Sequence, residues 1–349
     1  MKILIVKLSS IGDIIHTLPV LSAIRRALPT AEISWVAERK SAEILRNNQL
    51  ITNLIEIDTK NLTLREKILT ARHQLRELRK FSFDVTLDFQ GLWKSATIAK
   101  LSKTKKRFGF SKHVLREPAS RFLLTNTIDV PTKTHIVLKN LALVHKALKI
   151  DVPTENFEFP IFTEEKDVYE AEEIIAHSGD NFAILNPAGG WVTKLWHAEK
   201  FGILADKLWE KHGLTSIIAT GPKEKELAER VLKSNKSGKI MATTPTLKGF
   251  YELAKRAKIY VGGDTGPTFL AISAGAPVVG IFGPTEWWRN GSPNKDDICV
   301  ERTDIACRTD CHRRTCGNWI CMDIEVEMIL NAVTARLKKA ELKKEVRIG

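Results

Sequence analysis

The 349-residue chain has no long apolar run, few aromatic residues and no cysteine before position 299. Nowhere do 18 apolar residues follow one another, and the apolar stretch at 3–6 is too short for a signal-peptide core, so neither a membrane span nor a secretion signal is expected. Aromatic residues at 7% offer few stacking positions for nucleic acid. With 43% hydrophobic residues and no repeat or low-complexity tract, the composition predicts a globular cytoplasmic protein.

Acidic residues are scarce in the first half of the chain. Residues 1–150 contain 27 Lys+Arg against 12 Asp+Glu, whereas residues 151–349 contain 27 against 29. The formal net charge of +13 therefore lies entirely in the first half, which predicts two domains, the first of which meets a polyanion. A basic surface attracts anionic membranes and nucleic acids alike, so charge alone does not choose between them.

Short apolar runs alternate with helix-like stretches in both halves of the chain, the pattern of parallel sheets with crossover helices. A stretch with proline and threonine at about 150–165 interrupts the pattern and is typical of a linker. We therefore expect two doubly wound α/β domains, 1–155 and 166–322, followed by a helix within 323–349 that returns to the first domain. The strands are expected at 3–6, 33–36, 54–57, 85–89, 182–185, 215–219, 259–261 and 278–282, and the helices at 14–28, 64–80, 197–211, 223–233, 247–256 and 268–274.

The loop after the first expected strand carries a carboxylate where a helix begins. Asp13 lies in the first turn of that helix, and two roles remain open for it. As a structural residue it stabilises the helix start, because an acid there interacts favourably with the helix dipole. As a functional residue it is a general base at the mouth of an interdomain cleft, where it takes a proton from an attacking hydroxyl.

A glycine-rich turn between a strand and a helix spans 260–268. Glycines there allow close backbone approach, and the free N–H groups of a helix start attract phosphate. The Asp-Thr-Gly at 264–266 also occurs in aspartic proteases, but those enzymes are all-β and need a second carboxylate. A purely structural turn is the plain alternative.

Three further loops favour a nucleotide-sugar site. Lys194, in the loop 186–196, is suited to neutralise a departing pyrophosphate, although a solvated lysine is the simpler interpretation. Glu224, in the loop 221–224, is placed to accept hydrogen bonds from ribose hydroxyls or simply favours a helix start. The loop 283–286 extends the same rim.

Five motifs follow one another along the chain: Lys7–Pro19, Asp88–Ala96, Arg116–Pro118, Lys194–Trp196 and Gly263–Gly266. Taken together, they resemble the ADP-heptose:lipopolysaccharide heptosyltransferases, most of all their heptosyltransferase I branch. The similarity runs from residue 1 to about 290. It implies a GT-B fold, with two Rossmann-like domains facing across a cleft and the donor in the second, and a metal-independent inverting transfer that needs no cofactor.

The resemblance assigns roles to individual residues. Asp13 is implied to be the base that deprotonates a Kdo hydroxyl, which then attacks the heptose of ADP-heptose. Lys194 offsets charge on the ADP leaving group, Thr265 and Gly266 bind its phosphates, and Glu224 holds the ribose. The implied donor-binding set is Gly189, Gly190, Glu224, Asp264, Thr265 and Gly266.

Two positions depart from the pattern of that family. Phe269 stands where the family commonly has a histidine, and a phenyl ring neither donates to phosphate nor titrates. Gly189 and Gly190 stand where many members have hydroxyl or small residues, so backbone N–H groups are expected to replace side-chain donors.

The implied acceptor is Kdo-lipid A at the cytoplasmic face of the inner membrane, which places the protein peripherally at that surface. The phosphates and carboxylates of such an acceptor suit the basic first half, although most basic runs are simply solvated faces. No nucleic-acid partner is expected. The candidate acceptor contacts are Ser10, Gly12, Lys94, Arg107, Arg116 and Arg121.

All five cysteines lie between 299 and 321. The spacing of Cys307, Cys311, Cys316 and Cys321 permits a structural zinc or iron ion, but it is not the usual Cys-x2-Cys knuckle, and free packed thiols are the plain alternative. Disulfides are disfavoured in a reducing cytoplasm.

Three other functions stay open at this point. A nucleic-acid-binding protein would also explain the basic half, and a non-catalytic module would bind the nucleotide sugar without turnover. A transferase with the same donor loops but another acceptor, a second core heptose or a protein, is the third.

Overall fold

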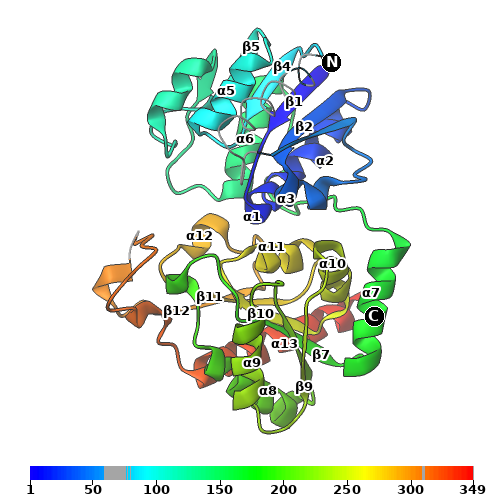
Figure 1. Ribbon diagram of the computed structural model, residues 1–349, viewed down its shortest axis with the longest axis vertical. Coiled ribbons are helices and arrows are strands. Elements are labelled where there is room, and N and C mark those ends of the chain that lie inside the picture. Colours follow the sequence, from blue (N-terminus) through cyan, green and yellow to red (C-terminus); the bar gives the residue numbers. More distant parts are fainter. Residues whose placement is uncertain (59–75, 77, 79, 309–310, 349) are drawn as a thin grey trace. The chain divides into compact units, whose positions relative to one another are not determined.

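The computed structural model describes residues 1–58, 76, 78, 80–308 and 311–348 of the chain. The helix expected at 64–80 falls almost wholly outside these residues. The chain divides into two compact units, Met1–Phe162 and Thr163–Gly349, each with its own parallel sheet (Figure 1). The division falls inside the stretch interpreted as a linker.

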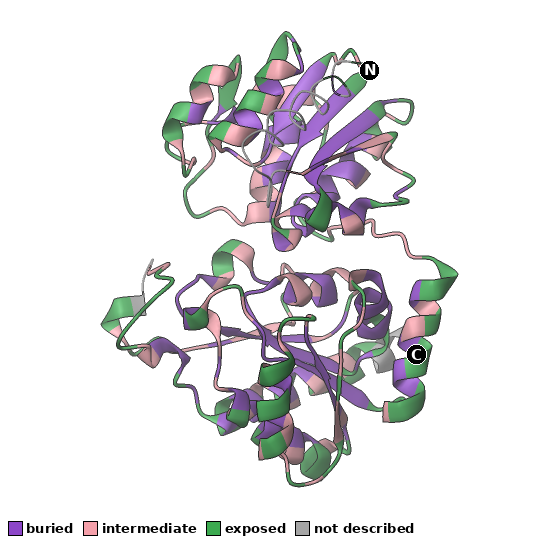
Figure 2. Cartoon of the chain, in the orientation of Figure 1, coloured by how far each residue is buried: buried purple, intermediate pink, exposed green. Residues whose placement is uncertain are grey.

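The first unit is built on a six-stranded parallel sheet with the order β3-β2-β1-β4-β5-β6. Its central strands are buried on both faces, as Figure 2 shows in purple. The strands are β1 Lys2–Val6, β2 Glu32–Glu38, β3 Asn53–Ile57, β4 Val85–Asp88, β5 Lys106–Phe110 and β6 Asn126–Ile128; the helices are α1 Ile11–Ile15, α2 Leu18–Ala27, α3 Arg39–Ala42, α5 Trp93–Leu101 and α6 Ile136–Leu148, with short 3-10 turns η1 Glu43–Leu45 and η2 Pro118–Leu123.

The second unit repeats this topology, with the order β12-β11-β10-β7-β8-β9. If the strands of this unit are numbered from β7 as the first, they lie in the same order as the strands of the first unit. This is the strand order of a Rossmann-like sheet. The strands are β7 Phe182–Asn186, β8 Thr215–Ala219, β9 Ile240–Thr243, β10 Ile259–Gly263, β11 Val278–Phe282 and β12 Ile298–Glu301; the helices are α7 Glu165–Ser178, α8 Ala198–His212, α9 Lys225–Ser234, α10 Leu247–Arg256, α11 Gly266–Ser273, α12 Trp287–Asn290 and α13 Val326–Ile348, with 3-10 turns η3 Val192–Lys194, η4 Ala306–Arg308 and η5 Ile320–Met322.

The expected α/β fold is confirmed, and all eight expected strands are present. The strands that the sequence did not indicate, β5, β6, β9 and β12, bury fewer of their residues than the central strands. Three of them lie at the edges of the sheets, where one side of the strand has no neighbour and no continuous apolar run is needed. The helix expected at 14–28 is divided into α1 and α2, because Pro19 in the first turn of α2 has no N–H to continue a helical ladder.

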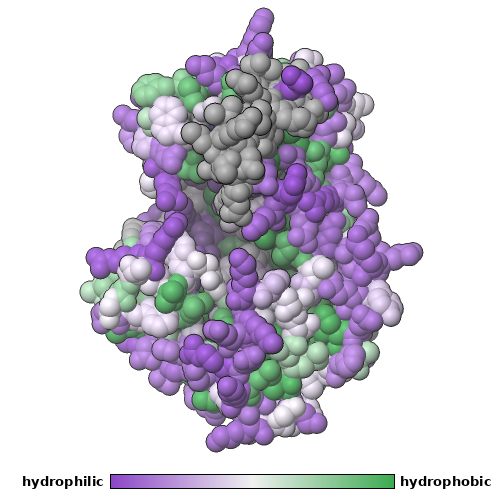
Figure 3. All heavy atoms as spheres, in the orientation of Figure 1, coloured by the Kyte–Doolittle hydropathy of each residue, from purple (hydrophilic) through white to green (hydrophobic). Residues whose placement is uncertain are grey.

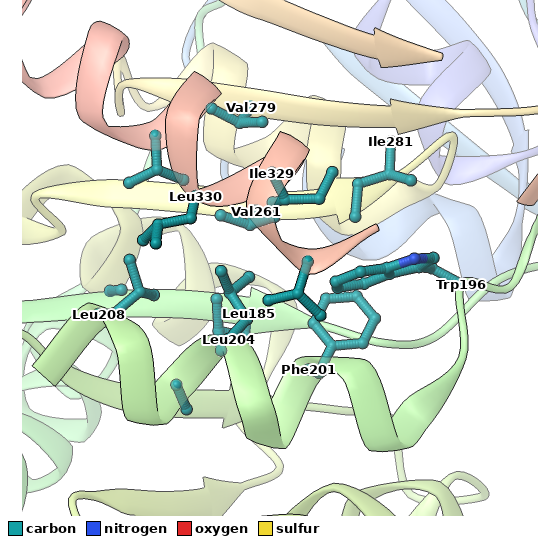
Figure 4. Close-up of a cluster of buried hydrophobic side chains, with 14 of the residues drawn as sticks. Leu185, Trp196, Phe201, Leu204, Leu208, Val261, Val279, Ile281, Ile329 and Leu330 are labelled. Carbon is teal, nitrogen blue, oxygen red and sulfur yellow. The ribbon is translucent and has the colours of Figure 1, made fainter. Parts of the chain in front are cut away.

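Helix α13 packs within the second unit, on α8 and on strands β10 to β12. Its residues Ile329, Leu330 and Val333 are buried in the same apolar cluster as Trp196 and Phe201, whose rings meet edge to face at 4.8 Å (Figure 4). The second unit therefore covers the apolar face of this helix, and the expected return of the helix to the first domain stays a prediction.

A buried ion pair fastens α13 to the edge of its sheet. The Arg336 Nε lies 2.8 Å from Asp297 Oδ1, and both side chains are at most 5% exposed. The Asp297 carboxylate also accepts hydrogen bonds from the Val278 N–H and the Ser292 hydroxyl. Burial raises the pKa of Asp297, because it disfavours the charged carboxylate. Arg336 and the two hydrogen-bond donors stabilise that charge.

The surface is mainly hydrophilic on the face drawn in Figure 3, with apolar residues scattered among charged ones. Within the described residues, no helix combines the length and the apolar content needed to cross a bilayer.

We expect Arg336→Ala to lower the free energy of unfolding by about 3–5 kcal/mol, because it leaves the Asp297 carboxylate buried without its cation. Chemical denaturation followed by circular dichroism measures the change. Lys343→Ala is the matched control on the same helix: its side chain is 65% exposed where it pairs with Asp296, so a change below about 1 kcal/mol is expected. Equal effects of the two substitutions would contradict the importance of the buried pair.

Candidate active site

In each unit the strand order reverses direction beside the first strand of the sheet, between β1 and β4 and between β7 and β10. Ligands of such sheets bind beyond the carboxyl ends of the strands at this point. In the first unit the two loops there carry Asp13 and Asp88. In the second unit they carry Lys194 and Asp264.

Asp13 is held by the start of its own helix and by a buried lysine. Its Oδ2 accepts hydrogen bonds from the Ser10 N–H at 2.8 Å and from the Ser10 hydroxyl at 3.2 Å. Its Oδ1 lies 3.5 Å from Lys7 Nζ, and the Asp13 side chain stays 40% exposed. Burial acts to raise the pKa of Asp13, but the Lys7 charge and the Ser10 donors outweigh it, so the pKa is lowered. Asp13 is thus an ionised, accessible carboxylate, and it serves as both helix cap and potential base.

Lys7 and Gln90 join the two loops of the first unit, and the sequence did not single them out. The buried Lys7 ammonium donates to the Phe89 carbonyl at 3.1 Å. Gln90 Oε1 accepts from the Leu8 N–H at 3.0 Å and from the Ser9 N–H at 3.3 Å. The sequence did contain a signal for Lys7, because this lysine directly follows a strand that is expected to be buried. An ammonium group that is removed from water needs an anion nearby.

Asp88 is the second carboxylate at this edge, and it is fully buried. Burial raises its pKa to about 6, although the carboxylate accepts hydrogen bonds from the Gln90 and Gly91 N–H groups and the Ser95 hydroxyl. These donors close the turn between β4 and α5. Asp88 therefore shapes the loop that carries Gln90, and its lack of exposure keeps it from contact with a substrate.

Two of the expected acceptor contacts already have protein partners. Lys94 Nζ lies 2.6 Å from Glu38 Oε1, so its charge is balanced within the unit. The Arg107 guanidinium donates to the carbonyls of Leu123 and Thr104, at 3.0 and 2.5 Å, which ties β5 to the segments around it.

The other expected acceptor contacts are more open. Arg116 is exposed, and Arg121 stacks over the Phe122 ring at 4.8 Å. Ser10 is exposed at the start of α1, whereas Gly12 is buried in the first turn of that helix.

In the second unit, Lys194 and Asp264 form a close ion pair. Lys194 Nζ lies 2.6 Å from Asp264 Oδ2 and 3.3 Å from the Asp264 carbonyl. Both side chains are largely buried, at 13% and 5% exposure. The other Asp264 oxygen accepts from the Asn290 amide at 3.1 Å. The structure therefore brings together two of the expected residues, and Asp264 orients the lysine.

Thr265 is the N-cap of α11, and Gly266 is the first residue of that helix. The Thr265 hydroxyl lies 3.2 Å from the Thr268 hydroxyl, which also meets the buried Tyr260 hydroxyl at 2.9 Å. The N–H groups of the first turn of α11 have no partners within the helix and suit an anion. Phe269, on the next turn, is buried and 6% exposed.

The glycines of the donor loops differ in how much space a side chain would have at each position. A Cβ on Gly263 would lie 3.2 Å from the Lys194 carbonyl, so glycine at the end of β10 permits the close approach of the lysine loop. A Cβ on Gly189 would meet the Leu195 side chain at 2.8 Å, whereas nothing lies within 4 Å of one on Gly190. Gly190 thus borders open space.

Glu224 has a structural role in the described geometry. Its Oε2 accepts from the Gly221 N–H at 2.6 Å, which closes the turn between β8 and α9. This is the simpler of the two roles that the sequence left open.

The four cysteines of the expected metal site line one pocket with Trp319. Cys307 and Cys316 are exposed, whereas Cys321 is buried, and burial raises the pKa of its thiol. Among the residues that the structure describes, no three or more His, Cys, Asp or Glu side chains are arranged to hold a metal ion. The structural zinc or iron ion expected at these cysteines stays a prediction.

The cysteine-containing segment also supports the donor loops. The Thr193 hydroxyl donates to the Arg313 carbonyl at 2.6 Å, and the Trp319 indole N–H donates to the Thr193 carbonyl at 3.0 Å. The His312 N–H donates to the Pro284 carbonyl at 2.9 Å. Sequence reasoning missed these contacts, because the two that involve Thr193 join residues more than a hundred positions apart and the third links two separate loops.

Comparison with known proteins is consistent with this geometry. The sequence model of "Glycosyltransferase family 9 (heptosyltransferase)" matches residues 71–320. Lipopolysaccharide heptosyltransferase 1 of Pseudomonas aeruginosa is 26% identical over 321 residues, covering 90% of this chain and 87% of that protein. Lipopolysaccharide heptosyltransferase 3 of Escherichia coli is 24% identical over 291 residues, covering 81% of this chain and 84% of that protein.

Solved structures share the fold along nearly the whole chain. A family 9 glycosyltransferase from Veillonella parvula aligns with a TM-score of 0.82 and 21% identity, covering 97% of each chain. The Escherichia coli heptosyltransferase WaaC with ADP aligns with a TM-score of 0.73 and 22% identity, covering 98% of this chain and 100% of that one. The two Rossmann-like sheets are therefore those of a GT-B protein. With a family match over most of its length, the chain belongs to glycosyltransferase family 9, the heptosyltransferases.

Proposed function

We propose that this enzyme transfers L-glycero-D-manno-heptose from ADP-heptose to a Kdo residue of Kdo-lipid A, with Asp13 as the general base. The observation that carries the proposal is the state of Asp13. Its carboxylate is accessible at the end of β1, and Lys7 and Ser10 lower its pKa. The family membership supplies the reaction class, glycosyl transfer.

Asp13 accepts the proton of the Kdo hydroxyl as the oxygen of that hydroxyl bonds to the anomeric carbon of heptose. The bond from this carbon to the ADP oxygen breaks, and ADP leaves with the electron pair. A single displacement of this kind inverts the anomeric centre and needs no protein nucleophile. Because Asp13 is ionised near neutral pH, it is ready to take the proton.

The second unit supplies the charges that meet the leaving group. Lys194 lies next to the first turn of α11, where Thr265 and Gly266 present backbone N–H groups. Donors placed where negative charge develops stabilise the transition state most effectively. Gly189 and Gly190 leave room for the nucleotide beside this turn, and Glu224 is proposed to contact the ribose through its remaining oxygen.

The basic first unit is proposed to hold the anionic acceptor. Arg116 and Arg121 lie beside the start of α5, and the N–H of Trp93 there donates to Glu117. Trp93 and Phe122 are 47% and 71% exposed on the same part of the unit. Cations beside exposed aromatic rings suit a lipid-linked acceptor, and we place the enzyme peripherally at the cytoplasmic face of the inner membrane.

A different acceptor is the second candidate. The curated relatives of this chain include lipopolysaccharide heptosyltransferases 1 and 3 and lipooligosaccharide heptosyltransferase 2, at 23–26% identity. Transfer to a core heptose would use the same donor loops, so only the acceptor distinguishes the two reactions.

The deciding experiment measures ADP release from ADP-heptose with and without Kdo-lipid A. We expect acceptor-dependent release that falls by about 100-fold or more in Asp13→Ala, because the attacking hydroxyl loses its base. The affinity for ADP should stay within about twofold of the wild type if Asp13 acts only on the acceptor.

Asp84→Ala is the matched control, because Asp84 is an exposed carboxylate of the same unit that accepts from the Lys2 N–H, away from Asp13 in the chain. It should retain wild-type release. Release that requires a heptosylated acceptor instead of Kdo-lipid A would identify the second candidate, and ADP binding without turnover on any acceptor would refute transfer altogether.

Lys7→Met should move the acid limb of the pH profile of kcat/KM to higher pH. The Lys7 charge favours the Asp13 carboxylate, so its removal raises the pKa of Asp13, and more of the base is protonated at low pH. The lost rate should therefore recover as the pH rises. Lys2→Met, which removes an exposed lysine paired with Glu32, should leave the limb in place. If the maximal kcat/KM fell while the acid limb stayed at its wild-type pH, this role for Lys7 would be contradicted.

A further inference from the structure

The positive charge of Lys194 is already balanced inside the second unit. Its ammonium lies 2.6 Å from Asp264 Oδ2, and both groups are largely buried. A nucleoside diphosphate carries at least two negative charges, and a paired lysine contributes little net charge to attract them. The donor site therefore needs a further cation.

A second cation lies at the same indole ring. Lys194 Nζ is 4.2 Å from the centroid of the Trp191 ring, and Arg314 Cζ is 5.1 Å from it. Arg314 is exposed, and no carboxylate among the described residues forms an ion pair with it. Among the described residues its guanidinium is thus unpaired by a carboxylate and suited to bind an anion, and the indole stabilises its position.

The backbone that carries Arg314 is fastened to the lysine loop. Thr193, next to Lys194, donates its hydroxyl to the carbonyl of Arg313 and accepts the Trp319 indole N–H on its own carbonyl. These two bonds, one on each side of Arg314 in the chain, fix the segment against the loop. Both cations are thus carried by segments that these two hydrogen bonds join.

We propose that Arg314 is a second diphosphate-binding residue of the donor site, which acts beside Lys194 on the phosphates of the ADP-sugar. The inference rests on the proposed donor. A guanidinium offers paired N–H donors that match two phosphate oxygens, and it keeps its charge at any working pH. Arg314 binds the diphosphate of the intact donor, and it stabilises the negative charge that develops on ADP as ADP leaves.

The test compares the binding of ADP, AMP and adenosine by isothermal titration calorimetry in the full chain. Arg314→Gln should weaken ADP binding by about tenfold and AMP binding less, because fewer phosphate oxygens lose a charged partner. Adenosine binding should not change. Arg314→Lys should recover part of the loss, and the ADP affinity of Arg314→Gln should depend less steeply on salt than that of the wild type.

Arg313→Gln is the matched control, because this neighbouring exposed arginine contributes only its backbone carbonyl to the loop. It should bind ADP within about twofold of the wild type. Equal losses in the two variants, or equal losses for ADP and adenosine in Arg314→Gln, would overturn the assignment of Arg314. A wild type that binds neither ADP nor ADP-heptose would instead overturn the proposed donor, and the inference with it.

Discussion

In each sheet, one pair of neighbouring strands determines where a ligand can bind. These pairs are β1 with β4 and β7 with β10. Val6 of β1 pairs with Asp88 of β4, and Asn186 of β7 pairs with Gly262 of β10. Because these strands are parallel, both of their loops emerge at the same edge of the sheet, at the point where the strand order reverses. The carboxylate of Asp13 and the ion pair of Lys194 both lie at such points.

Buried charge in this protein depends on close partners. Lys7 is almost completely buried, yet it has the Phe89 carbonyl and the Asp13 carboxylate within 3.5 Å. Lys194 and Asp264 satisfy each other in the second unit. Lys7 lowers the pKa of the proposed base, Asp13. Lys194 is oriented by Asp264, and we propose that it meets the leaving group from that position.

The cysteine-containing segment has a role that its spacing does not reveal. Four cysteines within fifteen residues predict a metal ion, and in the structure these four line one pocket. The same segment also supports the donor loops through Thr193, Arg313 and Trp319. Those contacts follow from the tertiary packing, whereas the spacing of the thiols predicts only that their sulfur atoms lie near one another.

The sequence by itself determined the α/β class, eight of the strands, the family and the identity of Asp13, Lys194 and Asp264 as residues in the loops that follow strands. These follow from local pattern, because a strand buried on both faces must be apolar and its polar groups must lie beyond its end. Only the tertiary structure decided that α13 belongs to the second unit, that Lys7 supports Asp13, and that Arg314 lies at the ring of Trp191. Those contacts join residues far apart in the chain or buried in its packing, and no local preference of the backbone encodes them.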